Sequence, residues 1–233
     1  MSNNKIDVSI TKSNGSIIYR IKENSFTASD AFDKTFYEKD KDSYIRIYQS
    51  KLMFEHDIEK LNKNYNVFIN REYFGFKSID LIDTALEWIC DIHKENNIKW
   101  WLVGSAALYI RGINLIPHDL DIMTYLSEIN KIKNLVKDVI IEPFHHVTDW
   151  ATKGFGVIDK NVRIDYAFEP VDNVDLQYGQ CDFGNYAEQN LEAFEWHGRK
   201  ILIPPVHLHI MPNENRNRTE RVKMIKDYIR NNS

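Results

Sequence analysis

Apolar residues recur at two spacings along the chain, and these separate the expected helices from the expected strands. In residues 78–97, isoleucines and leucines follow one another at steps of three and four, which is the period of a helix with one buried side. Residues 98–104 form a largely apolar run of strand length, as expected of a strand buried on both faces. The middle of the chain is therefore expected to open with a helix and a buried strand.

Further helices and strands follow from there to the C-terminus. A short Ala-rich helix closed by Gly112 comes first, and a tight polar turn is expected in each of two later hairpins. The expected elements are a helix at 105–112, a strand at 118–126, a helix at 127–138, a strand at 139–146 interrupted by Pro143, hairpins at 154–169 and 193–204, and a helix at 215–232. This order predicts an α+β (mixed α/β) fold, with helices packed on a mixed sheet.

The first part of the chain has a different character. It is polar and aromatic, and Ile47, Leu52 and Ile58 predict one amphipathic helix over 44–63. We therefore divide the chain into an N-terminal extension, 1–76, to which the sequence assigns no chemistry, and a second domain, 77–233, that ends in the C-terminal helix.

Charge and cysteine content narrow the classes of partner. Thirty Lys and Arg against 34 Asp and Glu give a net charge of −4, so no broad cationic surface is expected and any contact with nucleic acid would be local. The two cysteines are too few for a disulfide framework or a thiolate zinc site, so no disulfide partner is expected. The sequence shows no basic-then-apolar leader at its start and no apolar run of about 18 residues that would span a membrane. We therefore expect a cytoplasmic protein with no membrane contact.

Two acids interrupt the apolar strand expected at 118–126. Because side chains alternate faces along a strand, Asp119 and Asp121 lie on one face, while Leu120 and Ile122 lie on the other. Two carboxylates so close repel each other unless one is protonated or a cation lies between them. A hard divalent ion, Mg²⁺ (or Mn²⁺), is the simplest such cation, because it prefers oxygen ligands and is commonly held by one or two carboxylates plus phosphates.

A third acid is expected on a neighbouring strand. In the strand that begins at Val162, Asp165 shares a face with Arg163 and Ala167. If this strand lies beside the one with Asp119 and Asp121, three carboxylates converge, enough for metal binding and a general base. Asp165 could instead pair with Arg163 or another neighbour.

The turn before the short helix suggests a place for phosphate. Gly104 lets the backbone approach a ligand, and the hydroxyl of Ser105 with the first N–H groups of the helix would face an anion. Ser105 could also be a helix N-cap, and the two roles are compatible. Near the C-terminus, Arg218 and the arginines beside it could hold a triphosphate, although a charged terminal helix is more often a solvated face.

This arrangement resembles the nucleotidyltransferase superfamily, which includes DNA polymerase β, the CCA-adding enzymes and the small antibiotic nucleotidyltransferases. The shared pattern is a strand ending in Gly-Ser, a short helix, a strand with Asp-x-Asp, and a third Asp on a later strand; it covers roughly residues 78–170. Residues 199–229 are also similar to the closing region of the minimal members. The resemblance implies that Asp119, Asp121 and Asp165 are the catalytic, metal-binding carboxylates.

The implied activity is that of a metal-dependent transferase, which moves a nucleotidyl group from a nucleoside triphosphate such as ATP to a hydroxyl of an unidentified acceptor. A small molecule such as an antibiotic is favoured over RNA because of the negative net charge, while a tRNA end or a protein side chain stays open. One alternative is a catalytically silent nucleotide-binding or interaction module of the same fold. Another is a zinc hydrolase built on His207, His209 and other histidines, which their spacing disfavours.

Overall fold

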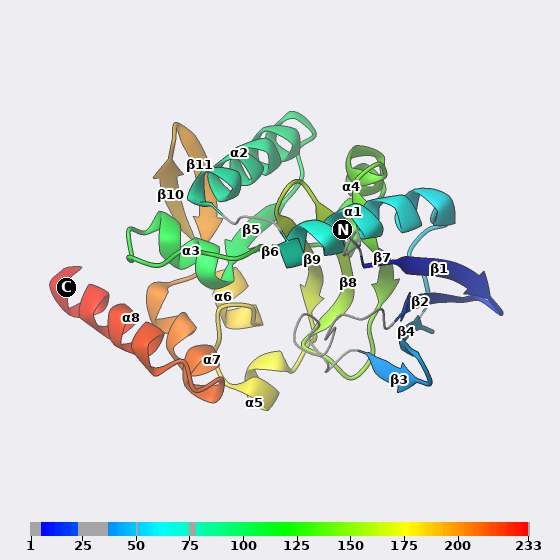
Figure 1. Cartoon of the computed structure of the whole chain (residues 1–233). Helices are drawn as coiled ribbons and strands as arrows, with labels where there is room; N and C mark the ends of the chain where they lie inside the picture. Colours follow the sequence, from blue (N-terminus) through cyan, green and yellow to red (C-terminus); the bar gives the residue numbers. More distant parts are fainter. Residues whose placement is uncertain (1–5, 23–36, 50, 75–77, 233) are drawn as a thin grey trace.

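A five-stranded mixed sheet forms the centre of the protein. In a computed structural model of the chain, residues 6–22, 37–49, 51–74 and 78–232 are described. The strands of the central sheet follow the order β5-β6-β9-β8-β7 (Figure 1). They are β5 Trp100–Val103, β6 Leu120–Thr124, β7 Ile140–His146, β8 Thr152–Asp159 and β9 Arg163–Pro170. Only the β6–β9 pair is parallel among these neighbours, so the mixed sheet expected from the sequence is confirmed.

The helices with strong apolar periodicity are also confirmed, so the fold is α+β. Four short elements between β9 and the last helix were not expected, because they are too brief to show a period. The helices of this half are α2 Ile79–Glu95, α3 Gly104–Ile110, α4 Ile129–Val136 after a 3₁₀ turn Leu126–Glu128, α5 Val174–Tyr178, α6 Asn185–Gln189, the 3₁₀ helix η4 Val206–His209, α7 Ile210–Asn215 and α8 Thr219–Asn232. The hairpin of β10 Glu192–Trp196 and β11 Arg199–Ile203 turns where expected, and β11 lies beside β5.

The N-terminal part forms a second, antiparallel sheet in the order β1-β2-β4-β3. Its strands are β1 Val8–Ser13, β2 Ser16–Lys22, β3 Glu38–Asp40 and β4 Ser43–Tyr48. The helix expected over 44–63 is wrong in its first half, because β4 pairs with β2 there, and residue 50 lies outside the described residues. Helix α1 Ile58–Phe74 begins only after Asp57, whose carboxylate accepts a hydrogen bond from the Lys60 N–H at 3.0 Å.

One apolar core joins the two sheets. It includes Ile17 and Tyr19 of β2 together with Leu120 of β6 and Tyr166 of β9, all fully buried. The Tyr19 hydroxyl also donates a hydrogen bond of 2.7 Å to the carbonyl of Ile141 in β7. The N-terminal sheet is therefore packed onto the sheet that carries the acids, and the domain boundary predicted at 76/77 lies outside the described residues.

Helix α1 runs along the open edge of β1 and takes the place of a further strand. Asparagines at every fourth position of α1 bind the backbone of every second residue from Ile6, just before β1, to Ile10. Four helical residues advance by about 6 Å and two strand residues by about 6.8 Å, so the two repeats stay in step. The N–H groups of Ile6, Val8 and Ile10 donate to the side-chain oxygens of Asn70, Asn66 and Asn62 at 2.9, 3.0 and 3.0 Å.

The same helix closes a second edge, that of the central sheet. The side-chain amide of Asn64 donates to the carbonyl of Ile140 in β7 at 3.0 Å, from the side of α1 that faces away from β1. Unpaired backbone groups at a sheet edge invite pairing with another chain, so α1 protects both sheets. The asparagines also fix how the two sheets sit against one another.

We expect Asn66→Ala to destabilise the protein by about 2 kcal/mol, since the buried Val8 backbone loses partners for both its N–H and its carbonyl. Asn134→Ala, on the exposed side of α4, is the matched control and should change stability by less than about 0.5 kcal/mol. Urea denaturation gives both values. Equal effects in the two variants would contradict the role of the asparagines.

Candidate functional site

Asp121 and Asp165 lie directly opposite each other in the parallel pairing of β6 with β9. Leu120, Ile122 and Ile164 alternate with them and are fully buried on the other face of the sheet. The strand with Asp165 therefore lies beside the strand with Asp121, as the convergence of the acids requires. Asp119 stands one residue before β6 and is half-buried, so the three acids gather on one face.

Crowding of these acids disfavours their charged forms. Burial, followed by the charges of Asp119, Asp165 and Asp182, raises the pKa of Asp121 well above its ordinary value. Burial also raises the pKa of Asp165 to about 6, even though Arg163 acts to lower it. Such a cluster would gain free energy from a cation.

Gly104 passes against the carboxylate of Asp121. Its φ is +66°, a left-handed conformation that favours glycine, and a Cβ there would lie 2.2 Å from Asp121 Oδ2. The turn between β5 and α3 can therefore lie beside the acid only because residue 104 lacks a side chain. The close neighbour of Gly104 in this structure is Asp121. Contact of Gly104 with phosphate stays a prediction.

A fourth acid, Asp182, holds this turn in place and has no counterpart among the sequence predictions. Its Oδ2 accepts hydrogen bonds from the Gly104 N–H at 2.9 Å and from His209 Nδ1 at 3.0 Å. Burial acts to raise the pKa of Asp182, but His209 and these hydrogen bonds outweigh it and lower the pKa. Asp182 comes from a segment without apolar periodicity, so no sequence signal singled it out.

Ser105 is buried at the start of α3, but it is not the helix N-cap. The N-cap position is Val103, which makes no side-chain capping bond, so that alternative for Ser105 is wrong. Contact of Ser105 with phosphate stays a prediction.

Arg216 and Arg221 lie close enough to the acids for their charges to interact. Arg216 acts to lower the pKa of Asp121, against the larger effects of burial and the neighbouring acids. Burial and the neighbouring Arg218 lower the pKa of Arg221, while Asp119 acts to raise it. The ion pairs of the C-terminal segment are formed by other basic side chains: Lys226 pairs with Glu214, and Arg230 pairs with Asp227. Arg216 and Arg221 thus lie beside the acids at the start of β6, and Arg218 lies near Arg221.

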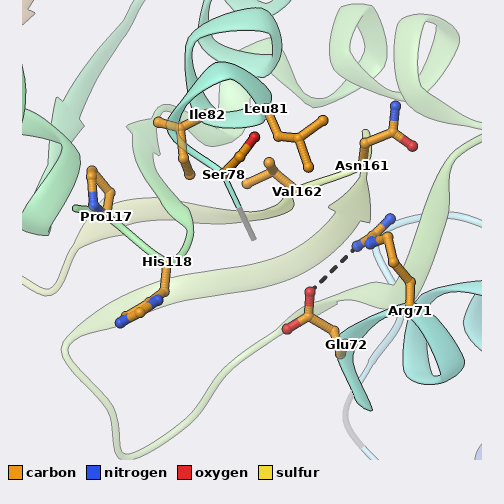
Figure 2. Close-up of a pocket in the computed structure, with 9 residues that line it drawn as sticks. All are labelled: Arg71, Glu72, Ser78, Leu81, Ile82, Pro117, His118, Asn161 and Val162. Carbon is orange, nitrogen blue, oxygen red and sulfur yellow. Dashed lines mark hydrogen bonds and ion pairs between the residues drawn. The ribbon is translucent and has the colours of Figure 1, made fainter. Parts of the chain in front are cut away.

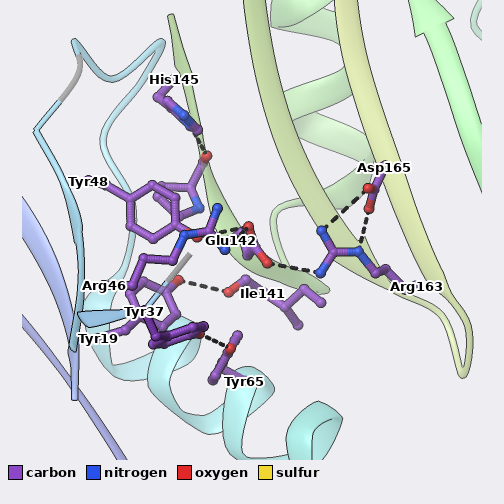
Figure 3. A network of polar contacts seen from close by, with 11 residues as sticks. Tyr19, Tyr37, Arg46, Tyr48, Tyr65, Ile141, Glu142, His145, Arg163 and Asp165 are labelled. Carbon is purple, nitrogen blue, oxygen red and sulfur yellow. Dashed lines mark hydrogen bonds and ion pairs between the residues drawn. The ribbon is translucent and has the colours of Figure 1, made fainter. Parts of the chain in front are cut away.

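Asp165 is engaged by Arg163, as the alternative for this residue anticipated. Arg163 Nε donates to Asp165 Oδ1 at 2.7 Å, and Nη2 donates to Oδ2 at 3.3 Å (Figure 3). Among the described residues, no group of three or more His, Cys, Asp or Glu side chains is arranged to hold a metal ion. The donors that remain for a hard cation are the carboxylates of Asp119 and Asp121, a set that suits Mg²⁺.

The histidines of the rival hydrolase do not gather. His209 is buried against Asp182, whereas His207 is exposed. His145 stacks edge-on against Tyr48, far along the sheet from β6. These positions agree with structural or surface roles.

A small cavity opens beside the start of β6, between α1, α2 and the turn that joins β8 to β9 (Figure 2). It is about 20 Å³ in volume, enough for a single water molecule and far too small for a nucleotide. Its lining includes His118 and Val162, the neighbours of Asp119 and Arg163. This cavity is therefore not a nucleotide site, and a larger cavity of about 330 Å³ at the end of α2 has none of the three acids in its lining.

Comparisons with known proteins found likeness only among solved structures. No family model and no curated protein matches the chain. A crystal structure of a candidate nucleotidyltransferase from Thermotoga maritima is 16% identical, with a TM-score of 0.45, and the match covers 64% of this chain and 92% of that one. A TM-score this low does not establish a shared fold. Within the described residues, no helix is both long and apolar enough to cross a membrane.

We expect Asp121→Asn to stabilise the metal-free protein at neutral pH. Because the folded-state pKa of Asp121 is raised, its favourable contribution is complete below about pH 4, where the unfolded chain is protonated, and is lost as pH rises towards the folded-state pKa. The advantage of the variant should therefore grow between pH 4 and pH 8. Unfolding temperatures in chelator measure it, with the exposed Asp7→Asn as control. An advantage that shrinks with rising pH would contradict the crowding of the acids.

Proposed function

We propose that the chain is a metal-dependent nucleotidyltransferase. The observation that carries the proposal is the meeting of opposite charges: Asp119 and Asp121 at the start of β6, and Arg216 between α7 and α8 together with Arg221 in α8. A magnesium triphosphate has both signs of charge, so it is complementary to such a surface. The sequence resemblance to the nucleotidyltransferase superfamily supports the same activity.

Each residue then has a defined role. Asp119 and Asp121 would hold Mg²⁺ (or Mn²⁺), and Arg218 with its two neighbours would bind the phosphates, close to Gly104 and Ser105. The ion, when bound, neutralises negative charge on the triphosphate and on the departing pyrophosphate. Asp165 is the third carboxylate, and its pKa of about 6 suits a group that accepts the proton of an acceptor hydroxyl near neutral pH.

The acceptor is proposed as a small hydroxylated molecule. The chain has a net charge of −4, and the arginines beside the acids form a local group rather than a broad basic surface. A tRNA end or a protein side chain would need further contacts elsewhere.

A catalytically silent nucleotide-binding module is the second candidate, and one observation favours it. Asp165 is bound by Arg163 through two hydrogen bonds, so the third carboxylate is not free in this structure. Both candidates bind a triphosphate; only the enzyme releases pyrophosphate when an acceptor is present.

The binding test is a thermal-shift series with ATP, GTP, CTP and UTP, each with and without Mg²⁺. We expect at least one triphosphate to raise the unfolding temperature in a Mg²⁺-dependent manner. At one hundred times Kd the stabilisation is about 2.7 kcal/mol, or roughly 5–10 °C for a chain of this size. Asp121→Asn should abolish the shift, although it stabilises the metal-free protein.

Arg218→Ala should also reduce the shift, whereas Lys223→Ala, an exposed residue on the same stretch of chain, should leave it unchanged. No shift with any triphosphate, or an undiminished shift in Asp121→Asn, would overturn the proposed site.

A further inference from the structure

Arg163 lies between two carboxylates on the acid face of the central sheet. Besides its two bonds to Asp165, it donates from Nη1 to Glu142 Oε1 at 2.9 Å (Figure 3). Glu142 belongs to β7, two strands away from β9, and Arg163 reaches across the intervening strand β8. One guanidinium thus divides its charge between the predicted third carboxylate and a second acid that the sequence did not single out.

Glu142 is held from its other side by the N-terminal sheet. Arg46 Nη1 lies 3.0 Å from Glu142 Oε2, and the Tyr48 hydroxyl donates to the same oxygen at 2.8 Å. Both residues come from β4. The Glu142 side chain is only 2% exposed. Burial acts to raise its pKa, but Arg163 and Arg46 outweigh burial and hold the pKa at about 2. Glu142 is therefore a fixed, permanently charged acid at neutral pH.

The result is a line of alternating charges that runs from β4 to the candidate site: Arg46, Glu142, Arg163 and Asp165 (Figure 3). A guanidinium bound through two hydrogen bonds competes with any cation for the same carboxylate. Glu142 draws part of the charge of Arg163 to itself. It also leaves Arg163 with a partner when Asp165 turns away.

We propose that Glu142 is a positioning residue for Asp165. Anchored by Arg46 and Tyr48, it holds Arg163 at the β7 side of the acid face, so that Asp165 can leave the guanidinium and turn towards Asp119 and Asp121 when a divalent cation binds. The inference rests on the proposed function, because it takes Asp165 as the third carboxylate. The N-terminal sheet thereby contributes to the site, since β4 acts on it through one buried acid.

Two substitutions with opposite expected effects test this. Glu142→Gln keeps the shape of the side chain but removes its charge, so Arg163 should bind Asp165 more strongly and the half-saturating Mg²⁺ concentration should rise by roughly tenfold. Arg163→Lys keeps the charge but cannot bind Asp165 in a fork, so the half-saturating concentration should fall. The readout is the unfolding temperature as a function of Mg²⁺ concentration, which does not depend on turnover.

Glu87→Gln is the matched control, because it makes the same change at an acid that pairs with Arg199 instead of Arg163; its response to Mg²⁺ should equal that of the wild type. A purely structural role for the network would weaken Mg²⁺ binding in both test variants, and that outcome overturns the proposal. If Glu142→Gln does not fold, Arg163→Lys decides alone, and an unchanged or raised half-saturating concentration overturns the proposal. A wild type that fails to respond to Mg²⁺ with any triphosphate would instead overturn the proposed function.

Discussion

Parallel pairing of β6 with β9 sets Asp121 directly opposite Asp165, and the polar groups around the site compensate for that juxtaposition. Burial raises the pKa of each carboxyl, and repulsion from neighbouring acids, including that of Asp165 on Asp121, adds to the rise. Arg163 balances Asp165, while Asp182 has its own partners in the turn before α3 and adds to the repulsion on Asp121. Arg216 lies near the acids of β6 and acts to lower the pKa of Asp121. A bound magnesium triphosphate would satisfy both groups.

Two sets of polar contacts join the N-terminal sheet to the central sheet and its acids. The asparagines of α1 bind the backbone edges of both sheets, which fixes the position of the smaller sheet against the central one. Glu142 then connects β4 to the charge balance of the acid face, through Arg46 on one side and Arg163 on the other. Buried ionic networks of this kind add little net stability, because desolvation offsets the attraction. Their value here is the orientation that they impose on Arg163.

Sequence reasoning reached those features that depend on local periodicity. Strict alternation assigned Asp165 and the core residues of β9 to opposite faces, and the structure has them so. The strand β4 was mistaken for a helix because Ile47 happens to fit a helical period with later residues, while its conformation is decided by pairing with β2. Asp182 and Glu142 could not be found in this way. Each gains its role only when folding brings it to a distant partner, Gly104 in one case and Arg163 in the other.

The central claim is that the β6 acids and the arginines beside them bind a metal triphosphate. The most direct test is a crystal structure of the protein grown with Mn²⁺ and a non-hydrolysable nucleoside triphosphate, because the anomalous signal of manganese locates the ion without assumptions. We predict an anomalous peak in contact with the carboxylates of Asp119 and Asp121, with the phosphates against Arg218. A triphosphate bound elsewhere, or a manganese peak away from these carboxylates, would contradict the account.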